Sequence, residues 1–367
     1  MRMKTRAAVL RSADGRYGFE DLVLDPIGPR ELLVRIAGAG MCHTDLIARG
    51  PGFADAVLPV VLGHEGAGVV EAVGDGITGF AVGDHVVLSF DSCGDCRQCR
   101  DGQPAYCPEF GKSNLFGRRR DGSPGAAASD GTAVNSRWFG QSSFATFAVA
   151  TERNAVKVDP GLPLELLGPL GCGLLTGAGA VLNEMDLRPG QSIAVFGAGA
   201  VGLAAVMAAK LAGASDIVVV DLHPGRLELA RELGATRVHP GDQADLAAAI
   251  VGDGTGVDHS LDTTSVPAVM ATAIAVLAPR GGAVLVGGGP GLLTLHPSQL
   301  AGRRLTYVLE GSADPRELIP VLIGHWRAGR FPFDRLVRTY PLAEIDQAEA
   351  DSSSGTTIKP VLLPDRD

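Results

Sequence analysis

Four cysteines lie within one short segment of the chain, at positions 93, 96, 99 and 107. A loop that carries Cys93, Cys96, Cys99 and Cys107 at this spacing can place four thiolates at the corners of a tetrahedron, the arrangement that Zn²⁺ prefers. Redox-active cysteines more often occur as a single pair. Because four protein ligands leave no coordination position open, the pattern predicts a structural zinc site.

The two remaining cysteines, Cys42 and Cys172, lie far apart in the chain and beside glycines, with His64 between them in Gly63-His64-Glu65-Gly66. Two thiolates and one imidazole would make a Cys₂His ligand set with one open position, which is typical of a catalytic zinc. Taken singly, a cysteine is usually a small buried apolar residue. Spacing alone does not join three residues that stand so far apart.

A glycine-rich turn, Gly197-x-Gly199-x-x-Gly202, lies between a predicted strand at Ser192–Phe196 and a predicted helix at Ala200–Leu211. In this context the glycines allow a tight turn, the approach of a pyrophosphate to the backbone and close packing of the helix. The N-terminus of the helix adds partial positive charge. The turn therefore predicts a dinucleotide site.

Asp221 ends the next predicted strand, 19 residues after Gly202. A carboxylate at this place is expected to accept hydrogen bonds from the adenosine ribose and to repel a 2′-phosphate, which favours NAD over NADP. Arg226, a few residues later, is in a position to flank the adenosine.

The elements around these residues change in character near residue 173. Before it, short β segments alternate with Gly and Pro, and they are expected within Met1–Leu10 and at Leu32–Ile36, Gly68–Val73 and His85–Ser89. After it, strands and helices alternate, which predicts a parallel sheet covered on both faces. The segments of this second part are Ser192–Phe196, Ala200–Leu211, Ile217–Val220, Pro224–Leu233, His259–Asp262, Val269–Leu277 and Ala283–Val286, and a last strand is expected at Ile358–Leu363.

Composition excludes several classes of protein. A net charge of −9 argues against a nucleic-acid partner. The only basic run, Arg118–Arg120, lies in the polar segment Gly111–Arg137, which is expected to be a long, solvated surface loop. Neither a signal peptide nor a run of 18 apolar residues is visible, so a cytoplasmic protein without a membrane span is expected.

Together these motifs resemble the medium-chain, zinc-containing alcohol dehydrogenase family over nearly the whole chain. The segments that carry this resemblance are Gly63–Val70, Val82–Val86, Cys93–Cys107, Gly171–Gly173 and Gly197–Gly202. The resemblance implies an α/β protein with a GroES-like, mostly-β catalytic domain at 1–173, a doubly wound NAD-binding Rossmann domain at 174–311, and a return to the catalytic domain at 312–367. It also implies a homodimer or homotetramer, paired through an edge strand near Leu305–Glu310.

Within this family the chain is most similar to the aryl (benzyl) alcohol dehydrogenase branch, although relatives acting on terpenoid alcohols share much of the pattern. The similar segments are Cys42–Ile47, Phe139–Ala145, Thr176–Asn183, Phe331–Asp334 and Ile358–Val361. The implied reaction is the reversible oxidation of a primary alcohol, aromatic or allylic, to its aldehyde with hydride transfer to NAD.

The resemblance also implies a role for individual residues on the metal side of the site. Cys42, His64 and Cys172 would hold the catalytic zinc, one of two zinc ions per chain. Glu65 would lie near this metal, Asp45 would orient His64, and Thr44 would hydrogen-bond to the alcohol oxygen.

On the cofactor side, His43 and Lys359 match positions that contact the pyrophosphate, and Thr176 and Val201 match positions that press the nicotinamide toward the substrate. Many relatives have a histidine at the position of Ile47, where it ends a proton relay, so the final proton acceptor stays open here. Ile47, Phe90, Trp138 and Phe139 are expected to line an apolar pocket for a bulky alcohol.

Two alternatives remain. A thiol-dependent formaldehyde dehydrogenase would need basic residues at its substrate cleft, to bind a large acidic adduct. A non-catalytic, structural member of the family would keep the glycine turn but lose a catalytic zinc ligand, whereas Cys42, His64, Cys172 and Thr44 are all present.

Overall fold

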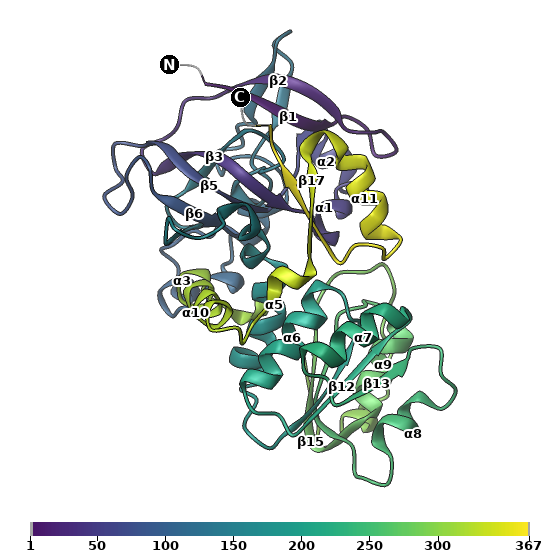
Figure 1. Ribbon diagram of the computed structural model, residues 1–367. Coiled ribbons are helices and arrows are strands. Elements are labelled where there is room, and N and C mark those ends of the chain that lie inside the picture. Colours follow the sequence, from purple (N-terminus) through teal and green to yellow (C-terminus); the bar gives the residue numbers. More distant parts are fainter. Residues whose placement is uncertain (1–2, 366–367) are drawn as a thin grey trace. The chain divides into compact units, whose positions relative to one another are not determined.

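The structure, a computed structural model, describes residues 3–365 and divides into two compact units (Figure 1). The first unit consists of Met1–Cys172, Asp314–Pro320 and Asp334–Asp367, and the second of Gly173–Ala313 and Val321–Phe333. The predicted return at residue 312 is interrupted, because Val321–Phe333 clusters with the second unit. No helix among residues 3–365 is long and apolar enough to cross a membrane.

The first unit is mostly β and contains a closed barrel and a larger sheet. The barrel order is β1-β2-β7-β8-β4, and its strands are β1 (Lys4–Leu10), β2 (Gly18–Leu24), β4 (Val60–Val61), β7 (Gly125–Ala128) and β8 (Ala133–Asn135). β1 covers most of the first strand expected within Met1–Leu10, of which Met1 and Arg2 lie outside the described residues.

The larger sheet has seven strands in the order β10-β6-β5-β3-β18-β17, with β9 also paired to β3. They are β3 (Glu31–Gly40), β5 (Glu65–Val73), β6 (His85–Leu88), β9 (Phe147–Thr151), β10 (Ala155–Val158), β17 (Val337–Pro341) and β18 (Lys359–Leu363). β3 is almost wholly buried, since it pairs with β5, β9 and β18. β18 lies where the last strand was predicted. It pairs with β3, so one sheet contains strands from both the N-terminal and the C-terminal part of the sequence.

Short helices connect these strands. They are α1 (His43–Ile47), α2 (Ala54–Val57), α3 (Arg97–Arg100) and α4 (Phe110–Asn114), and α11 (Ile345–Ser353) precedes β18. α10 (Pro315–Arg327) begins in the first unit and ends in the second.

The prediction of a long surface loop at Gly111–Arg137 is wrong. This segment contains the end of α4 and both β7 and β8, and Asn114, Asn135 and Arg137 are buried. Its elements have only three to five residues each, too few for a hydrophobic period to be recognised in the sequence.

The second unit is built on a sheet of six parallel strands in the order β13-β12-β11-β14-β15-β16. The strands are β11 (Ser192–Phe196), β12 (Asp216–Asp221), β13 (Arg237–Pro240), β14 (Val257–Asp262), β15 (Leu277–Leu285) and β16 (Arg304–Tyr307). The helices are α5 (Gly173–Gly179), α6 (Ala200–Leu211), α7 (Pro224–Leu233), α8 (Leu246–Val251) and α9 (Pro267–Ala275). This strand order is that of a doubly wound Rossmann sheet. The chain adds β12 and β13 on one side of β11, and then adds β14, β15 and β16 on the other side.

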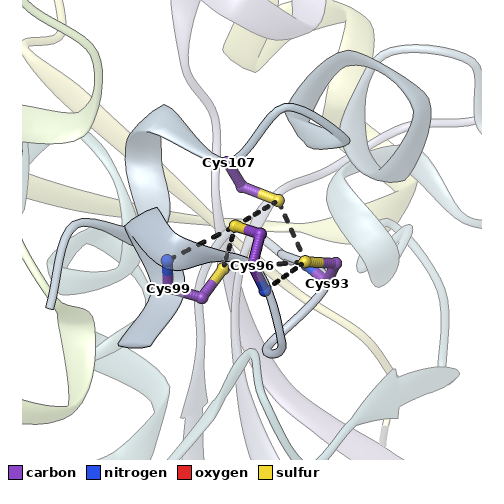
Figure 2. Close-up of side chains that lie close together, drawn as sticks. All are labelled: Cys93, Cys96, Cys99 and Cys107. Carbon is purple, nitrogen blue, oxygen red and sulfur yellow. Dashed lines mark hydrogen bonds between the residues drawn. The ribbon is translucent and has the colours of Figure 1, made fainter. Parts of the chain in front are cut away.

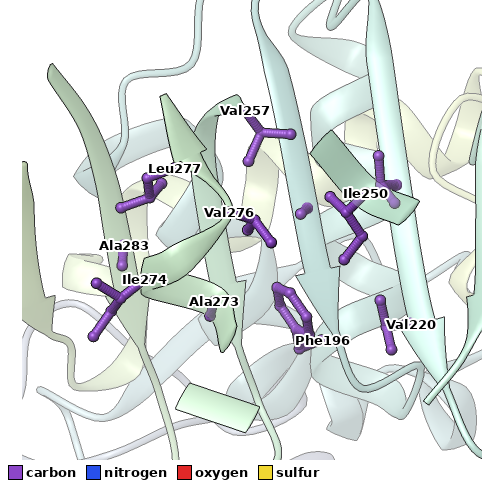
Figure 3. Packing of buried hydrophobic residues seen from close by; sticks show 11 residues of the cluster. Phe196, Val220, Ile250, Val257, Ala273, Ile274, Val276, Leu277 and Ala283 are labelled. Carbon is purple, nitrogen blue, oxygen red and sulfur yellow. The ribbon is translucent and has the colours of Figure 1, made fainter. Parts of the chain in front are cut away.

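The core of the second unit explains why its sequence alternates so clearly (Figure 3). Phe196 and Val220 from neighbouring strands contact the same buried cluster as Ile250 of α8 and Ala273 and Ile274 of α9. Strands covered on both faces must be apolar throughout, which is why β11 and β12 stand out in the sequence. The predicted helices at Ala200–Leu211 and Pro224–Leu233 are confirmed at both ends by α6 and α7.

Candidate metal and dinucleotide sites

Cys93, Cys96, Cys99 and Cys107 surround one point (Figure 2). The sulfur of Cys96 lies 3.5 Å from that of Cys99 and 4.0 Å from that of Cys107, and the sulfurs of Cys93 and Cys99 are 3.9 Å apart. Four sulfurs at about 2.3 Å from one zinc ion would be about 3.8 Å from one another. The separations therefore fit a zinc tetrahedron and are too long for disulfide bonds.

Backbone N–H groups prepare this lobe for thiolates. The N–H of Cys96 donates to Cys93 Sγ at 3.3 Å, and the N–H of Cys99 donates to Cys96 Sγ at 3.4 Å. Burial alone would raise the pKa of Cys93, but the N–H groups of Asp95 and Cys96 outweigh it and lower that pKa to about 7. Burial instead raises the pKa of Cys107 to about 12, so in the metal-free lobe the thiolate form is favoured at Cys93 and not at Cys107.

The second cluster forms where β3 and β5 meet. Gly40, the last residue of β3, pairs with Glu65, the first residue of β5, in an antiparallel register. Cys42 follows β3 as the N-cap of α1, and His64 directly precedes β5. Cys172 joins them, and the Cys42, His64, Glu65 and Cys172 ligand atoms all lie within 4.8 Å of one another. Strand pairing thus joins residues that sequence spacing could not.

The donor chemistry of this cluster fits a zinc ion. His64 is buried, and its Nε2 atom has no hydrogen-bond partner among the described residues. A hydrogen bond with the Cys172 thiol and the positive charge of Lys359 lower the pKa of Cys42 well below its usual value, although burial opposes them. A buried nitrogen lone pair beside two thiols is the arrangement that a Cys₂His zinc site requires.

Asp45 fixes the other side of the His64 ring. Asp45 Oδ1 lies 2.7 Å from His64 Nδ1 and accepts hydrogen bonds from the backbone N–H of Gly63 and from Trp138 Nε1, both at 3.1 Å. Its Oδ2 atom accepts from the N–H of Cys42, also at 3.1 Å. One buried carboxylate therefore positions two of the three candidate ligands, as carboxylates behind metal-binding histidines do.

The glycine turn of the second unit has the shape of a phosphate cradle. Gly197 has a φ of +94°, and a Cβ atom at Gly202 would lie 1.8 Å from the carbonyl oxygen of Gly197, so neither position tolerates a side chain. A Cβ at Gly199, by contrast, would meet no atom within 4 Å. The space beside Gly199, at the N-terminus of α6, is where a phosphate group would lie.

The chain matches two described protein families. The family description "Alcohol dehydrogenase GroES-like domain" matches residues 28–160, and "Zinc-binding dehydrogenase" matches residues 200–322. A geraniol dehydrogenase of Castellaniella defragrans is 46% identical over 98% of each chain. The chain belongs to the zinc-containing, medium-chain alcohol dehydrogenase family.

Solved structures of this dehydrogenase family show the same fold. An alcohol dehydrogenase zinc-binding domain protein from Burkholderia ambifaria has a TM-score of 0.96 and 45% identity, covering 100% of both chains. A benzyl alcohol dehydrogenase from Acinetobacter calcoaceticus has a TM-score of 0.94 and 41% identity, covering 99% of this chain and 100% of the other. The predicted fold, GroES-like catalytic domain and Rossmann domain, is confirmed.

Lys359 is buried beside the metal cluster, and its Nζ atom lies 2.9 Å from both Glu65 carboxylate oxygens and 3.1 Å from the Met41 carbonyl. These three acceptors occupy all three N–H donors of the ammonium group. Burial alone would lower the pKa of Lys359, but the charges of Glu65 and Cys42 outweigh it and raise this pKa, so the lysine neutralises the metal cluster. The contact with the cofactor pyrophosphate that the family resemblance implied for this lysine stays a prediction.

Three of the four predicted substrate-pocket residues are buried, and their place in a substrate pocket stays a prediction. Trp138 has no exposed surface and donates a hydrogen bond to Asp45. Phe139 is buried and packs on the His64 ring, with ring centroids 4.5 Å apart, while Phe90 is buried and packs on Phe110. Of these four predicted pocket residues, Ile47 in α1 is the one that is partly exposed.

The other predicted cofactor residues, Thr176 apart, lie near the ends of their elements. Asp221 ends β12, but its carboxylate accepts hydrogen bonds from the N–H groups of Ala198 and His223, at 2.6 and 2.8 Å. His43 begins α1 and is exposed. Arg226 lies in α7, Thr176 lies in α5 with its Oγ1 atom 3.5 Å from Glu310 Oε2, and Val201 lies in the first turn of α6.

Sequence reasoning missed a buried glutamine that joins the segments of the metal cluster. Gln141 Nε2 donates to the carbonyl oxygens of His64 and Ser89, at 2.9 and 3.0 Å, and its Oε1 atom accepts from the N–H of Gly66. Ser89 in turn donates its hydroxyl to the Gly171 carbonyl, next to Cys172. The run of polar residues between Phe139 and Phe144 is the only sequence signal of this network.

Proposed function

We propose that this dehydrogenase oxidises a bulky, apolar primary alcohol, aromatic or allylic, to its aldehyde with transfer of a hydride to NAD. The observation that carries this proposal is the convergence of Cys42, Cys172 and the unpartnered His64 Nε2 in one buried cluster. The names of two similar proteins, a geraniol dehydrogenase and a benzyl alcohol dehydrogenase, support the substrate class, since geraniol is an allylic and benzyl alcohol an aromatic primary alcohol.

The chain would hold two zinc ions, one in each cluster. Cys42, His64 and Cys172 would bind the catalytic ion, which supplies Lewis acidity to the oxygen of the alcohol. Cys93, Cys96, Cys99 and Cys107 would bind a structural ion. Asp45 keeps His64 in the orientation that leaves Nε2 free for metal, and Lys359 offsets the negative charge of Glu65 beneath the cluster.

Thr44 is the residue best placed to manage the proton of the alcohol. Its Oγ1 atom lies 3.9 Å from Cys42 Sγ, on the same short helix as Ile47. A hydroxyl can accept the proton of the alcohol while donating its own, but the apolar Ile47 cannot take it further. The proton therefore leaves from Thr44 by another acceptor, the cofactor ribose or water.

The bound nicotinamide cofactor would accept the hydride at its ring. The glycine turn would hold the pyrophosphate of NAD, and Asp221 would face the adenosine ribose beside that turn. A carboxylate there disfavours a 2′-phosphate, so NAD is preferred to NADP.

A panel of alcohols tests the proposal, with NAD or NADP and detection of the reduced cofactor by absorbance. Benzyl alcohol and geraniol should be oxidised with a higher kcat/KM than ethanol, and NAD should be preferred. Formaldehyde mixed with a low-molecular-weight thiol tests the alternative, a thiol-dependent formaldehyde dehydrogenase. If this mixture is oxidised and neither benzyl alcohol nor geraniol is, the proposal is overturned.

Assembly and location stay predictions. A homodimer or homotetramer would pair through β16, the edge strand of the six-stranded sheet and part of the segment expected for this role. The net charge of −9 agrees with the absence of nucleic-acid partners, and a cytoplasmic location stays a prediction.

A further inference from the structure

A hollow of about 580 Å³ lies in the first unit, contains no cysteine in its lining, and is lined chiefly by arginine. Its charged lining residues are Arg30, Arg118, Arg119, Arg120, Arg137 and Arg153, with Glu31, Asp91 and Asp121. Positive charge thus exceeds negative charge in the lining of a hollow on a protein whose net charge is −9. The volume is in the range of small-molecule sites.

Two of these arginines are committed to the fold. Arg119 contacts both carboxylate oxygens of Glu31, at 2.9 and 3.0 Å, and Arg153 contacts both of Asp91, at 3.0 and 3.1 Å. Such two-pronged pairs use the donors of the guanidinium group and fix its plane. Arg119 and Arg153 therefore build the walls of the hollow.

The floor of the hollow holds more positive charge than its carboxylate can balance. The buried Arg137 also contacts Glu31, at 3.0 Å, so one carboxylate serves two arginines. The Nε atom of Arg137 is buried without a hydrogen-bond partner among the described residues, and so is the Oγ atom of Ser113, another lining residue. Unsatisfied buried donors carry a free-energy cost that a bound acceptor would remove.

Two exposed arginines of the hollow, Arg118 and Arg120, supply further hydrogen-bond donors. Arg118 is exposed; among residues 3–365 its side chain makes one hydrogen bond, from Nε to Asn135 Oδ1 at 3.1 Å, and no ion pair with a carboxylate. Arg120 contacts Glu109 at 3.5 Å, and both side chains are 41% exposed. The other carboxylates near the rim are Asp25, which contacts Arg119, and Glu152, which contacts Arg30. Exposed pairs of this kind are weak and exchange readily for a better acceptor.

We propose that this hollow binds a small polyanion that bears phosphate or carboxylate groups, held by Arg118, Arg120, Arg137 and Ser113. Guanidinium groups match the geometry of phosphate and carboxylate oxygens, and several of them around one hollow favour an anion with more than one negative charge. Arg118 and Arg120, which were predicted from the sequence to lie in a solvated run, receive a binding role in this proposal. Arg119 is in fact half-buried in its ion pairs with Glu31 and Asp25.

Calorimetric titration of the full-length, zinc-loaded protein tests this site, with inorganic pyrophosphate and citrate as separate probes. A saturating dinucleotide is added first, so that the glycine turn is occupied and cannot take up pyrophosphate. The titration should show one site per chain, and the probe that binds more tightly identifies phosphate or carboxylate as the favoured group. Absence of binding by both probes would overturn the proposal.

Variants locate the site. Arg118→Gln with Arg120→Gln changes two exposed side chains and should weaken binding by about tenfold or more. Arg6→Gln with Arg16→Gln removes the same charge from exposed positions outside the hollow and should change binding by no more than about twofold. Ser113→Ala should also weaken binding without lowering the melting temperature, since it deletes an unsatisfied hydroxyl. Unchanged affinity in both hollow variants would contradict the assignment.

Discussion

The indole N–H of Trp138 donates a hydrogen bond of 3.1 Å to Asp45 Oδ1, the same oxygen that lies 2.7 Å from His64 Nδ1. All three side chains are buried. Trp138 thus lies behind the metal cluster, where its hydrogen bond helps to position Asp45 and, through Asp45, His64.

Trp138→Phe keeps the ring packing and removes this hydrogen bond. Asp45 would hold His64 less firmly, so we expect the affinity of the catalytic zinc to fall by up to about tenfold and stability by about 1 kcal/mol. Zinc retention against a chelator measures the first effect. Trp326→Phe in the second unit, where Trp326 packs on Phe333, is the matched control and should retain both zinc ions. Equal zinc retention by Trp138→Phe and the wild type would contradict the role.

Cys42→Ser removes one of three ligands from the catalytic set. We expect turnover to fall by several orders of magnitude while the affinity for NAD stays close to that of the wild type, because the glycine turn belongs to the other unit. Dinucleotide binding can be followed by fluorescence and zinc content by elemental analysis, which should fall from two ions to one. A variant that kept full turnover would rule out this ligand set.

Cys96→Ser removes a ligand from the four-cysteine lobe, where bound metal adds to the folding free energy. Its melting temperature should fall by about 10 °C or more. Cys42→Ser is the natural comparison, since it loses the other metal, and its melting temperature should fall by less because the three-ligand site contributes less binding free energy than the four-thiolate site. An unchanged melting temperature for Cys96→Ser would count against a structural zinc.

Glu31→Gln tests the charge balance under the arginine hollow. Burial alone would raise the pKa of Glu31, but the charge of Arg137 and the hydrogen bonds from Arg119 and Gly28 outweigh it, so this pKa is lowered in the folded protein. A lowered folded-state pKa stabilises the protein above the unfolded-state value and ceases to do so as the pH falls through the folded-state value.

At pH 7 the Glu31→Gln substitution should therefore cost about 2 to 4 kcal/mol, because it leaves Arg137 buried without its counter-charge. The difference from the wild type in the free energy of unfolding should shrink as the pH is lowered below about 4.5. Glu20→Gln, which breaks the exposed pair with Arg11, should cost less than about 1 kcal/mol. A loss that is the same at every pH would show that Glu31 acts through packing and not through its charge.

The parts of the molecule that could be predicted from the sequence are those with a strong local pattern. α6 and α7 follow from glycine, proline and apolar spacing, and the four-cysteine lobe follows from the spacing of its ligands. The segment between residues 111 and 137 could not be predicted, since β7 and β8 are short and depend on partners in β2 and β4.

The catalytic cluster marks a different limit. Its residues could be named through family resemblance, but the register that brings Cys42 to His64 is set by the pairing of Gly40 with Glu65, which is a long-range contact. The Lys359–Glu65 pair likewise joins opposite ends of the chain, and no local pattern indicates it.

Three consecutive residues, Arg137, Trp138 and Phe139, are committed to three different neighbours: Glu31, Asp45 and His64. Phe139 completes this arrangement with a φ of +51°, a left-handed conformation that costs a non-glycine residue about 1 kcal/mol or more. An insertion or deletion of one residue here would misdirect all three side chains at once. Protein engineers who alter this tripeptide should therefore randomise its positions jointly, at fixed length, and screen for metal content before they screen for a new alcohol.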